Sequence, residues 1–205
     1  MDLKPLDRLP SSLVEKCRQF GVDLADHYRG GGSPNSRAVS THGMQDNPDG
    51  LAASKMAECM FCLRFGVDPL ALPWSLRADP GWDIVVFGQR VDVKSTWLHG
   101  KFLIWPMGKN HLFDAKQFDM LALVKLERDE KTKARATGAG VISGWIPKRD
   151  FRQRRMVAGN DHALDAGARY MPEDELLPIE NGGVALARRA IAERKQFEFI
   201  SGRWP

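Results

Sequence analysis

Two aspartates lie close together in a segment whose alternating apolar residues predict a pair of strands, GWDIVVFGQRVDVKST at 81–96. Asp83 stands at the start of the first strand, and Asp92 lies towards the end of the second. Because neighbouring antiparallel strands lie about 5 Å apart, we expect both carboxylates to meet at one end of the hairpin. The predicted elements are a strand at 84–87, a tight turn at Gly88-Gln89 and a returning strand at 90–96.

The second of these strands separates polar from apolar side chains. Asp92 and Lys94 are two residues apart and therefore leave the same face, whereas Val91 and Val93 point to the other face. A hairpin that only needed stability would have little reason to carry two acids and a lysine so closely. The spacing indicates chemistry, and the alternative is an ion-pair hairpin at the surface, where such neighbours are common.

Carboxylate and carbonyl oxygens are the ligands that magnesium and manganese prefer, usually with several waters and a substrate phosphate. Asp83 and Asp92 meet that demand, and the carbonyl of Val93 is a further candidate ligand. Glu58, on a predicted helix upstream, stands beside the apolar stripe and is expected to complete the acidic cluster or to orient the attacking water. Lys94 is then expected to stabilise charge that develops on the phosphate oxygens.

This order of residues resembles the PD-(D/E)XK, or restriction-endonuclease-like, nuclease superfamily. In the resemblance Asp83 matches the first acidic position of the motif, Asp92 the second, and Lys94 its lysine. Glu58 matches the helix glutamate that many members carry. The resemblance implies that Glu58, Asp83, Asp92 and Lys94 are catalytic, and that Mg²⁺ or Mn²⁺ is the cofactor.

The resemblance covers roughly residues 49–127, and Trp82 stands where the motif has its proline. It implies an α/β (α+β) fold with a restriction-endonuclease-like core in αβββαβ order, in which a central mixed four- to five-stranded sheet is flanked by helices. It also implies a metal-dependent nuclease that hydrolyses phosphodiester bonds. A DNA endonuclease of DNA processing, restriction, recombination or phage DNA metabolism is the expected kind.

Helical periodicity predicts two helices before the hairpin. SSLVEKCRQFGVDLADHYR, at 11–29, predicts a helix with a serine cap. Residues 30–50 are rich in Gly, Ser, Asn and Pro and predict a loop. LAASKMAECMFCLRFG, at 51–66, predicts a second helix, because Asn47-Pro48-Asp49 supplies capping chemistry and Gly66 closes it.

Further strands and helices follow the hairpin. The predicted strands are 101–107, 120–127 and 138–146, and the predicted helices are a short one at 111–118 and a C-terminal one at 182–197. A chain of 205 residues fits one domain of ordinary size. We therefore expect a single nuclease domain, with an N-terminal helix and loop at 1–48, a catalytic core at 49–147 and a basic extension at 148–205.

Positive charge gathers in the second part of the chain. Lys and Arg number 9 against 10 Asp and Glu in residues 1–80, but 21 against 16 in residues 81–205. This distribution favours an anionic polymer, DNA above all, as the partner, and a solvated charge run is the alternative. The candidate nucleic-acid-binding residues are Ser95, Thr96, Gln117, Lys148, Arg149, Arg152, Arg154 and Arg155, with Phe151 or Trp145 as stacking partners and His111 or Gln117 to orient substrate or water.

Composition excludes several other classes of protein. Hydrophobic residues make up 43% and charged residues 27%, which argues against disorder. The sequence offers neither a membrane-spanning apolar run nor a secretory signal, so we expect a cytoplasmic protein without a membrane partner. Cys17, Cys59 and Cys62 are too few for an iron–sulfur or zinc site and are interpreted as buried thiols.

Three alternatives stay open. Glu58 is also interpreted as a solvated residue or as a partner of Lys55 or Arg64. The whole chain is alternatively a catalytically silent nucleic-acid-binding or regulatory protein that keeps the nuclease-like fold. A hydrolase that acts on another phosphate ester is the third and weaker alternative. A homodimer is expected if the protein cuts both strands of DNA.

Overall fold

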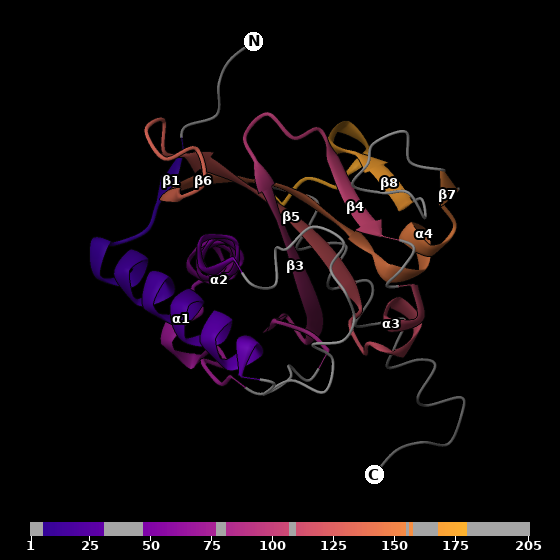
Figure 1. Cartoon of the computed structure of the whole chain (residues 1–205). Coiled ribbons are helices and arrows are strands. Elements are labelled where there is room, and N and C mark those ends of the chain that lie inside the picture. Colours follow the sequence, from indigo (N-terminus) through magenta and orange to yellow (C-terminus); the bar gives the residue numbers. More distant parts are fainter. Residues whose placement is uncertain are drawn as a thin grey trace.

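The computed structural model describes residues 6–30, 47–76, 81–106, 110–154, 156–157 and 168–179. Within them a central mixed sheet contains, in spatial order, β1 (Asp7–Arg8), β6 (Ala136–Pro147), β5 (Met120–Arg128), β3 (Gln89–Trp97) and β2 (Ile84–Val86). A smaller sheet contains β4 (Phe102–Pro106), β8 (Ala168–Pro172) and β7 (Met156–Val157). The predicted mixed α/β class is confirmed (Figure 1), and the central mixed sheet, predicted to have four to five strands, has five within the described residues. The helix predicted at 182–197, and most of the loop predicted at 30–50, lie outside the described residues.

Helix α1 (Ser11–Arg29) has the predicted bounds but not the predicted cap. Its N-cap is Pro10, and no side chain caps the first turn. The Pro10 carbonyl instead accepts hydrogen bonds from the backbone N–H groups of Leu13 and Val14, at 2.9 and 3.1 Å. The serine cap was wrong because the helix already begins at Ser11, so this hydroxyl lies inside the first turn.

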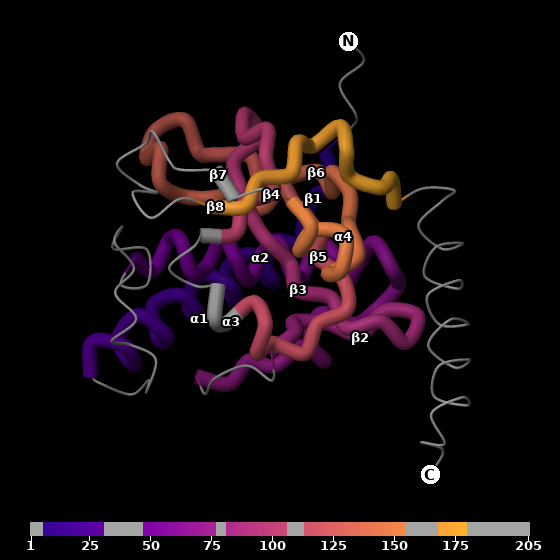
Figure 2. The backbone as a smooth tube through the Cα atoms, turned by 90° about the vertical axis from the view of Figure 1, so that its right-hand side faces the viewer, coloured from indigo at the N-terminus to yellow at the C-terminus, as the bar shows by residue number. Residues whose placement is uncertain are grey.

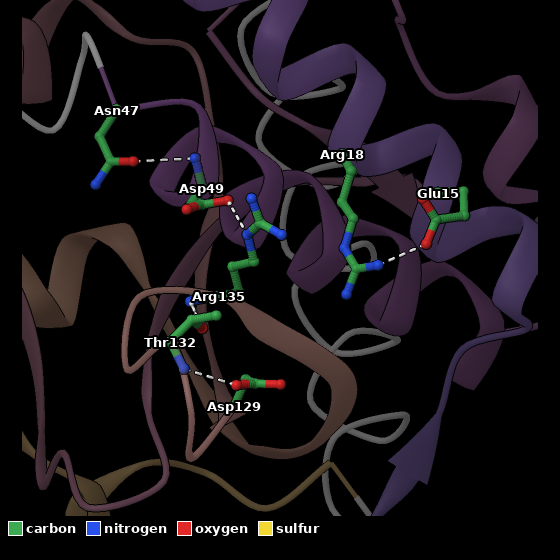
Figure 3. Close-up of polar contacts among 7 residues, drawn as sticks. All are labelled: Glu15, Arg18, Asn47, Asp49, Asp129, Thr132 and Arg135. Carbon is green, nitrogen blue, oxygen red and sulfur yellow. Dashed lines mark hydrogen bonds and ion pairs between the residues drawn. The ribbon is translucent and has the colours of Figure 1, made fainter.

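Helix α2 (Pro48–Arg64) starts three residues before the predicted boundary and uses the predicted capping residues. The Asn47 side chain accepts a hydrogen bond from the backbone N–H of Asp49 at 3.0 Å, and Pro48 occupies the first turn. The Asp49 carboxylate also pairs with Arg135, in the connection between β5 and β6, at 3.2 Å (Figure 3). These contacts fix the start of the helix that carries Glu58.

The central sheet is covered differently on its two faces. Helices α1 and α2 lie on one face, where Met56 and Cys59 pack with Val91 and Val93 in one hydrophobic core. A second core on the other face joins Leu121 and Leu123 to aromatic side chains of the smaller sheet and of α3 (Asn110–Ala115) and α4 (Lys148–Arg152). Figure 2, which faces the smaller sheet, shows β8 and α4 in front of the central strands and the long helices behind. Short 3₁₀ turns are η1 (Pro69–Ala71) and η3 (Glu173–Glu175).

The connection from β3 to β5 carries both β4 and α3, and β3 pairs with β5 in parallel. The chain order α2, β2, β3, β4, α3, β5 follows the predicted αβββαβ order. However, β4 pairs with β8 outside the central sheet, contrary to the predicted single core sheet flanked by helices. The physical reason is that β2 and β5 already occupy the two edges of β3.

The β2–β3 hairpin sets the register of the candidate site. Val86 pairs with Gln89, so the turn residues are Phe87 and Gly88, with φ of 50° and 76°. The predicted turn at Gly88-Gln89 was wrong by one residue, because a two-residue hairpin turn of this type needs positive φ at both central positions. Phe87 tolerates this backbone while its ring packs edge-on against Phe65, with centroids 5.8 Å apart.

Candidate active site

Strand β3 holds Asp92 and Lys94 on the face that carries the second core. Asp92 is fully buried, and the Lys94 ammonium forms an ion pair with its Oδ2 atom. The same ammonium lies 4.7 Å from the centre of the Trp105 ring, a cation–π distance. The predicted shared face of Asp92 and Lys94 is confirmed, and the burial of Asp92 contradicts the alternative of a surface ion pair.

Asp83 lies directly before β2 and reaches across to the backbone of β3. Its N–H donates to the Val91 carbonyl at 2.9 Å, and its Oδ2 accepts a hydrogen bond from the Val93 N–H at 2.6 Å. Burial, then the negative charges of Glu58 and Asp92, raise the pKa of Asp83 well above its usual range. The Lys94 charge and the Val93 N–H lower this pKa but do not offset the rise. Asp83 therefore keeps its proton to a higher pH than an ordinary aspartate when no cation is present.

Glu58 projects from α2 with a side chain that is only 12% exposed. Its carboxylate forms an ion pair with Lys55, whose ammonium also donates to the Pro73 carbonyl at 3.2 Å. This is the contact with Lys55 that the alternative interpretation of Glu58 predicted. The Glu58 charge nevertheless acts on Asp83, and together with burial it raises the pKa of Cys62 to about 12. Glu58 therefore belongs electrostatically to the same cluster.

Lys116 contacts Asp92 from the opposite side and was missed by the sequence interpretation. Its Nζ atom lies 3.0 Å from Oδ1 of Asp92, so each carboxylate oxygen faces one ammonium. Burial alone would raise the pKa of Asp92, but Lys94 and Lys116 together lower it. A sequence signal existed: Lys116 lies four residues before Met120, the start of the apolar strand β5, and parallel strands begin at the same end of a sheet.

The loop that carries Lys116 is fixed by its neighbours. Lys148 donates to the Lys116 carbonyl at 2.5 Å, and Arg90 donates to the Gln117 side chain at 3.3 Å. Burial is the main cause that lowers the pKa of Lys148, whose ammonium lies 4.5 Å from the Phe118 ring centre. Lys148 and Gln117, both predicted to bind nucleic acid, therefore make contacts within the protein.

The other predicted nucleic-acid-binding residues lie on β3 and on α4 and the residues after it. The Ser95 hydroxyl lies 3.4 Å from that of Ser54 on α2, and Thr96 packs against Gly100. Three arginines of the basic segment, residues 148–155, form ion pairs: Arg149 with Asp150, Arg152 with Asp114, and Arg154 with Glu175. Phe151 and Trp145 are fully buried, which excludes the predicted stacking on a base in this conformation. Arg155 and the His111 side chain lie outside the described residues.

A divalent cation is compatible with the donor atoms but does not have a preformed cage. Within the described ranges no three His, Cys, Asp or Glu side chains gather as a ready metal site. Magnesium usually needs only one or two carboxylates and keeps several waters, and Asp83 and Asp92 supply hard oxygen ligands from adjacent strands. The residues present therefore fit such a cation if an ammonium moves from Asp92.

The remaining predicted groups serve the fold. The thiols of Cys17, Cys59 and Cys62 are free and buried, as predicted, and the Cys17 and Cys59 sulfurs lie 3.8 Å apart.

No helix in the described part of the chain is both long enough and apolar enough to cross a membrane. No family model matches the chain, and no curated protein or solved structure matches it either.

Proposed function

We propose that the chain is a metal-dependent nuclease of the restriction-endonuclease-like kind, which hydrolyses phosphodiester bonds in DNA. The observation that carries the proposal is that the fully buried Asp92 and the half-buried Asp83 lie close together on the β2–β3 hairpin, where the charge of Glu58 also acts on Asp83. Burying carboxylates of like charge side by side is unfavourable unless a cation compensates them. Such an arrangement is common at functional sites and has little use in a purely structural hairpin.

The proposed cation ligands are the carboxylates of Asp83 and Asp92, with Glu58 and the Val93 carbonyl completing the oxygen donors. When bound, Mg²⁺ or Mn²⁺ supplies a Lewis acid that polarises the phosphate and lowers the pKa of water. Glu58 holds a negative charge close to Asp83 and orients the attacking water in this proposal. A cation held beside Asp83 would lower the pKa of this carboxyl, because a neighbouring positive charge favours its ionised form.

Lys94 stabilises the charge that develops on the phosphate oxygens during attack. Asp92 orients this ammonium through the ion pair, and the Trp105 ring limits its position from one side. The Lys94 side chain is 30% exposed, so a phosphate from solvent reaches its ammonium without unfolding of the hairpin. Ser95, Thr96 and the basic segment extend the proposed contact with the DNA backbone.

Plasmid cleavage tests this proposal. Purified protein is expected to nick or cut supercoiled plasmid with Mg²⁺ and to lose this activity in EDTA. Asp92→Ala and Lys94→Ala should abolish cleavage while circular dichroism shows an intact fold. Asp26→Ala, which removes an exposed acid of α1 paired with Arg29, is the matched control and should cleave like the wild type. Full activity in Lys94→Ala would refute the assignment.

A second candidate is a silent nucleic-acid-binding or regulatory protein with the same fold. One observation favours it: both oxygens of Asp92 already face ammonium groups, so the carboxylate is compensated without a metal. Isothermal titration calorimetry with Mg²⁺ or Mn²⁺ separates the candidates. The nuclease binds the cation and loses binding in Asp83→Ala, whereas the silent protein shows no binding in either form.

A further inference from the structure

Lys116 approaches the candidate site from outside the hairpin. Its Nζ atom lies 3.0 Å from Oδ1 of Asp92, whereas Lys94 pairs with Oδ2. The Lys116 side chain is 23% exposed and the Asp92 side chain 1% exposed, so the ammonium connects solvent with a buried carboxylate. A group in this position is accessible to a charged polymer that docks on the site.

Three independent contacts hold the backbone that carries Lys116. The Lys148 ammonium donates to its carbonyl, and Arg90 binds the side chain of the next residue, Gln117. Gly81, with φ of 96°, approaches so closely that an added Cβ would lie 3.4 Å from the Lys116 Cα and 3.2 Å from the Gln117 nitrogen. These contacts position the backbone, and the four-carbon stem of a lysine is flexible enough to redirect its ammonium to another partner.

The charges around Asp92 favour an exchange in which a divalent cation replaces the Lys116 ammonium on this carboxylate. The carboxylates of Glu58, Asp83 and Asp92 are accompanied by the ammonium groups of Lys55 and Lys94 and by that of Lys116. A divalent cation on Asp92 competes with the ammonium on the same carboxylate, since both are positive. A cation bound at Oδ1 of Asp92 would compete with Lys116, because Lys116 is the ammonium that pairs with this oxygen, whereas Lys94 pairs with Oδ2.

We propose that Lys116 is a second phosphate-binding residue of the site, which pairs with Asp92 until the divalent cation binds and then contacts a DNA phosphate. This inference rests on the proposed nuclease function and adds a residue to it. The exchange keeps Asp92 compensated at every stage, first by an ammonium and then by the cation. It also couples cation binding to DNA binding through one side chain.

Two measurements on Lys116→Met test the proposal. Calorimetry without DNA should show Mg²⁺ binding that is tighter by about fivefold or more, because the competing ammonium is gone. The affinity for a short DNA duplex in Ca²⁺, measured across a salt series, should show a slope of log K against log salt reduced by about 0.9, which corresponds to one lost phosphate contact. Lys116→Gln, which keeps a polar side chain at the position, should give the same two changes.

Lys116→Arg retains the charge and should keep the wild-type salt slope. Lys131→Met, an exposed lysine of the β5–β6 connection, is the control for a simple loss of charge and should leave the Mg²⁺ affinity unchanged. Wild-type Mg²⁺ affinity together with a wild-type salt slope in both Lys116→Met and Lys116→Gln overturns the proposal. Neither readout needs cleavage, so absence of cleavage by the wild type counts against the nuclease function, not against the role of Lys116.

Discussion

Asp83 and Asp92 have the same chemistry, but Asp83 is half-buried and Asp92 fully buried, and their electrostatic surroundings are opposite. Burial, and then the charges of Glu58 and Asp92, raise the pKa of Asp83. Asp92 lies between the ammonium groups of Lys94 and Lys116, and its pKa is lowered despite burial. One carboxylate is thus destabilised and the other stabilised in the absence of a cation. This contrast gives two predictions of opposite sign.

Asp83→Asn should make the metal-free protein more stable at neutral pH. Because the folded pKa of Asp83 is raised, the wild type loses stability as pH rises from about 4, the usual Asp range, through the folded pKa. Asparagine carries no charge and keeps an oxygen that accepts the Val93 N–H. Urea denaturation in EDTA at pH 4 and pH 8 checks this. A variant less stable than the wild type at pH 8 would contradict it.

Asp92→Asn should instead destabilise the protein, by about 1–3 kcal/mol at pH 7, because two charge-assisted contacts lose their carboxylate. The folded pKa of Asp92 is lowered, so its contribution is present above the usual Asp range of about 4 and is lost as pH falls through the folded pKa. The stability difference between variant and wild type should therefore narrow in acid. An equal difference in free energy of unfolding at pH 7 and pH 3 speaks against this assignment.

The sequence was informative about side chains that are neighbours on one strand and uninformative about long-range partners. Side chains alternate between the two faces of a strand, so the sequence placed Asp92 and Lys94 on one face, and the structure confirms their contact. Lys116 lies 24 residues from Asp92, and only the parallel pairing of β3 with β5 brings it near. The ion pairs of Arg152 and Arg154 could not be predicted from the sequence for the same reason, because their partners Asp114 and Glu175 come from other elements.

At the scale of elements, the hairpin turn controls whether the two aspartates meet. Gly88 has φ of 76°, which favours glycine, so Gly88→Ala should lower the free energy of unfolding by about 1–3 kcal/mol. Val85→Thr, an exposed position on the same hairpin, should change it by less than about 0.5 kcal/mol. Chemical denaturation of both variants checks this. Equal stability of Gly88→Ala and the wild type would exclude a positional role for the turn.

The helices were predictable from local signals, whereas the pairing of strands was not. Asn47 and Pro48 provide local capping chemistry, and α2 begins there. The assignment of β4 to the smaller sheet depends on β8, which lies more than sixty residues later in the chain. Local sequence also failed at Phe87, whose positive φ is unusual for a bulky residue and moved the turn by one position.

At the scale of the whole molecule, the proposed function predicts that the exposed arginines of α4 help to bind an anionic polymer. The side chains of Arg149 and Arg152 are 72% and 62% exposed, and their ion pairs with Asp150 and Asp114 are weak in water. The double variant Arg149→Ala/Arg152→Ala should weaken DNA binding at all sequences and reduce the salt slope by about two. A salt slope in the double variant equal to that of the wild type would identify the basic segment as a solvated charge run that does not contact DNA. Fluorescence anisotropy over a salt series is the measurement.

The central sheet separates two hydrophobic cores, and the candidate site lies at the end of the sheet where β3 and β5 begin. Elements from both faces contribute to it: α2 supplies Glu58, and the segment after α3 supplies Lys116. The site thus depends on the correct assembly of the whole described fold. A change in either layer is expected to alter the site without touching its residues.

The most direct measurement of the central claim is the rate of plasmid cleavage as a function of Mg²⁺ concentration, in the wild type and in Asp83→Asn. The wild-type rate should rise with Mg²⁺ and saturate, and the folded Asp83→Asn protein should show no cleavage across the same range because a cation ligand has lost its charge. Cleavage that is independent of Mg²⁺, or equal in the two proteins, would contradict the assignment of this cluster as a metal-dependent active site.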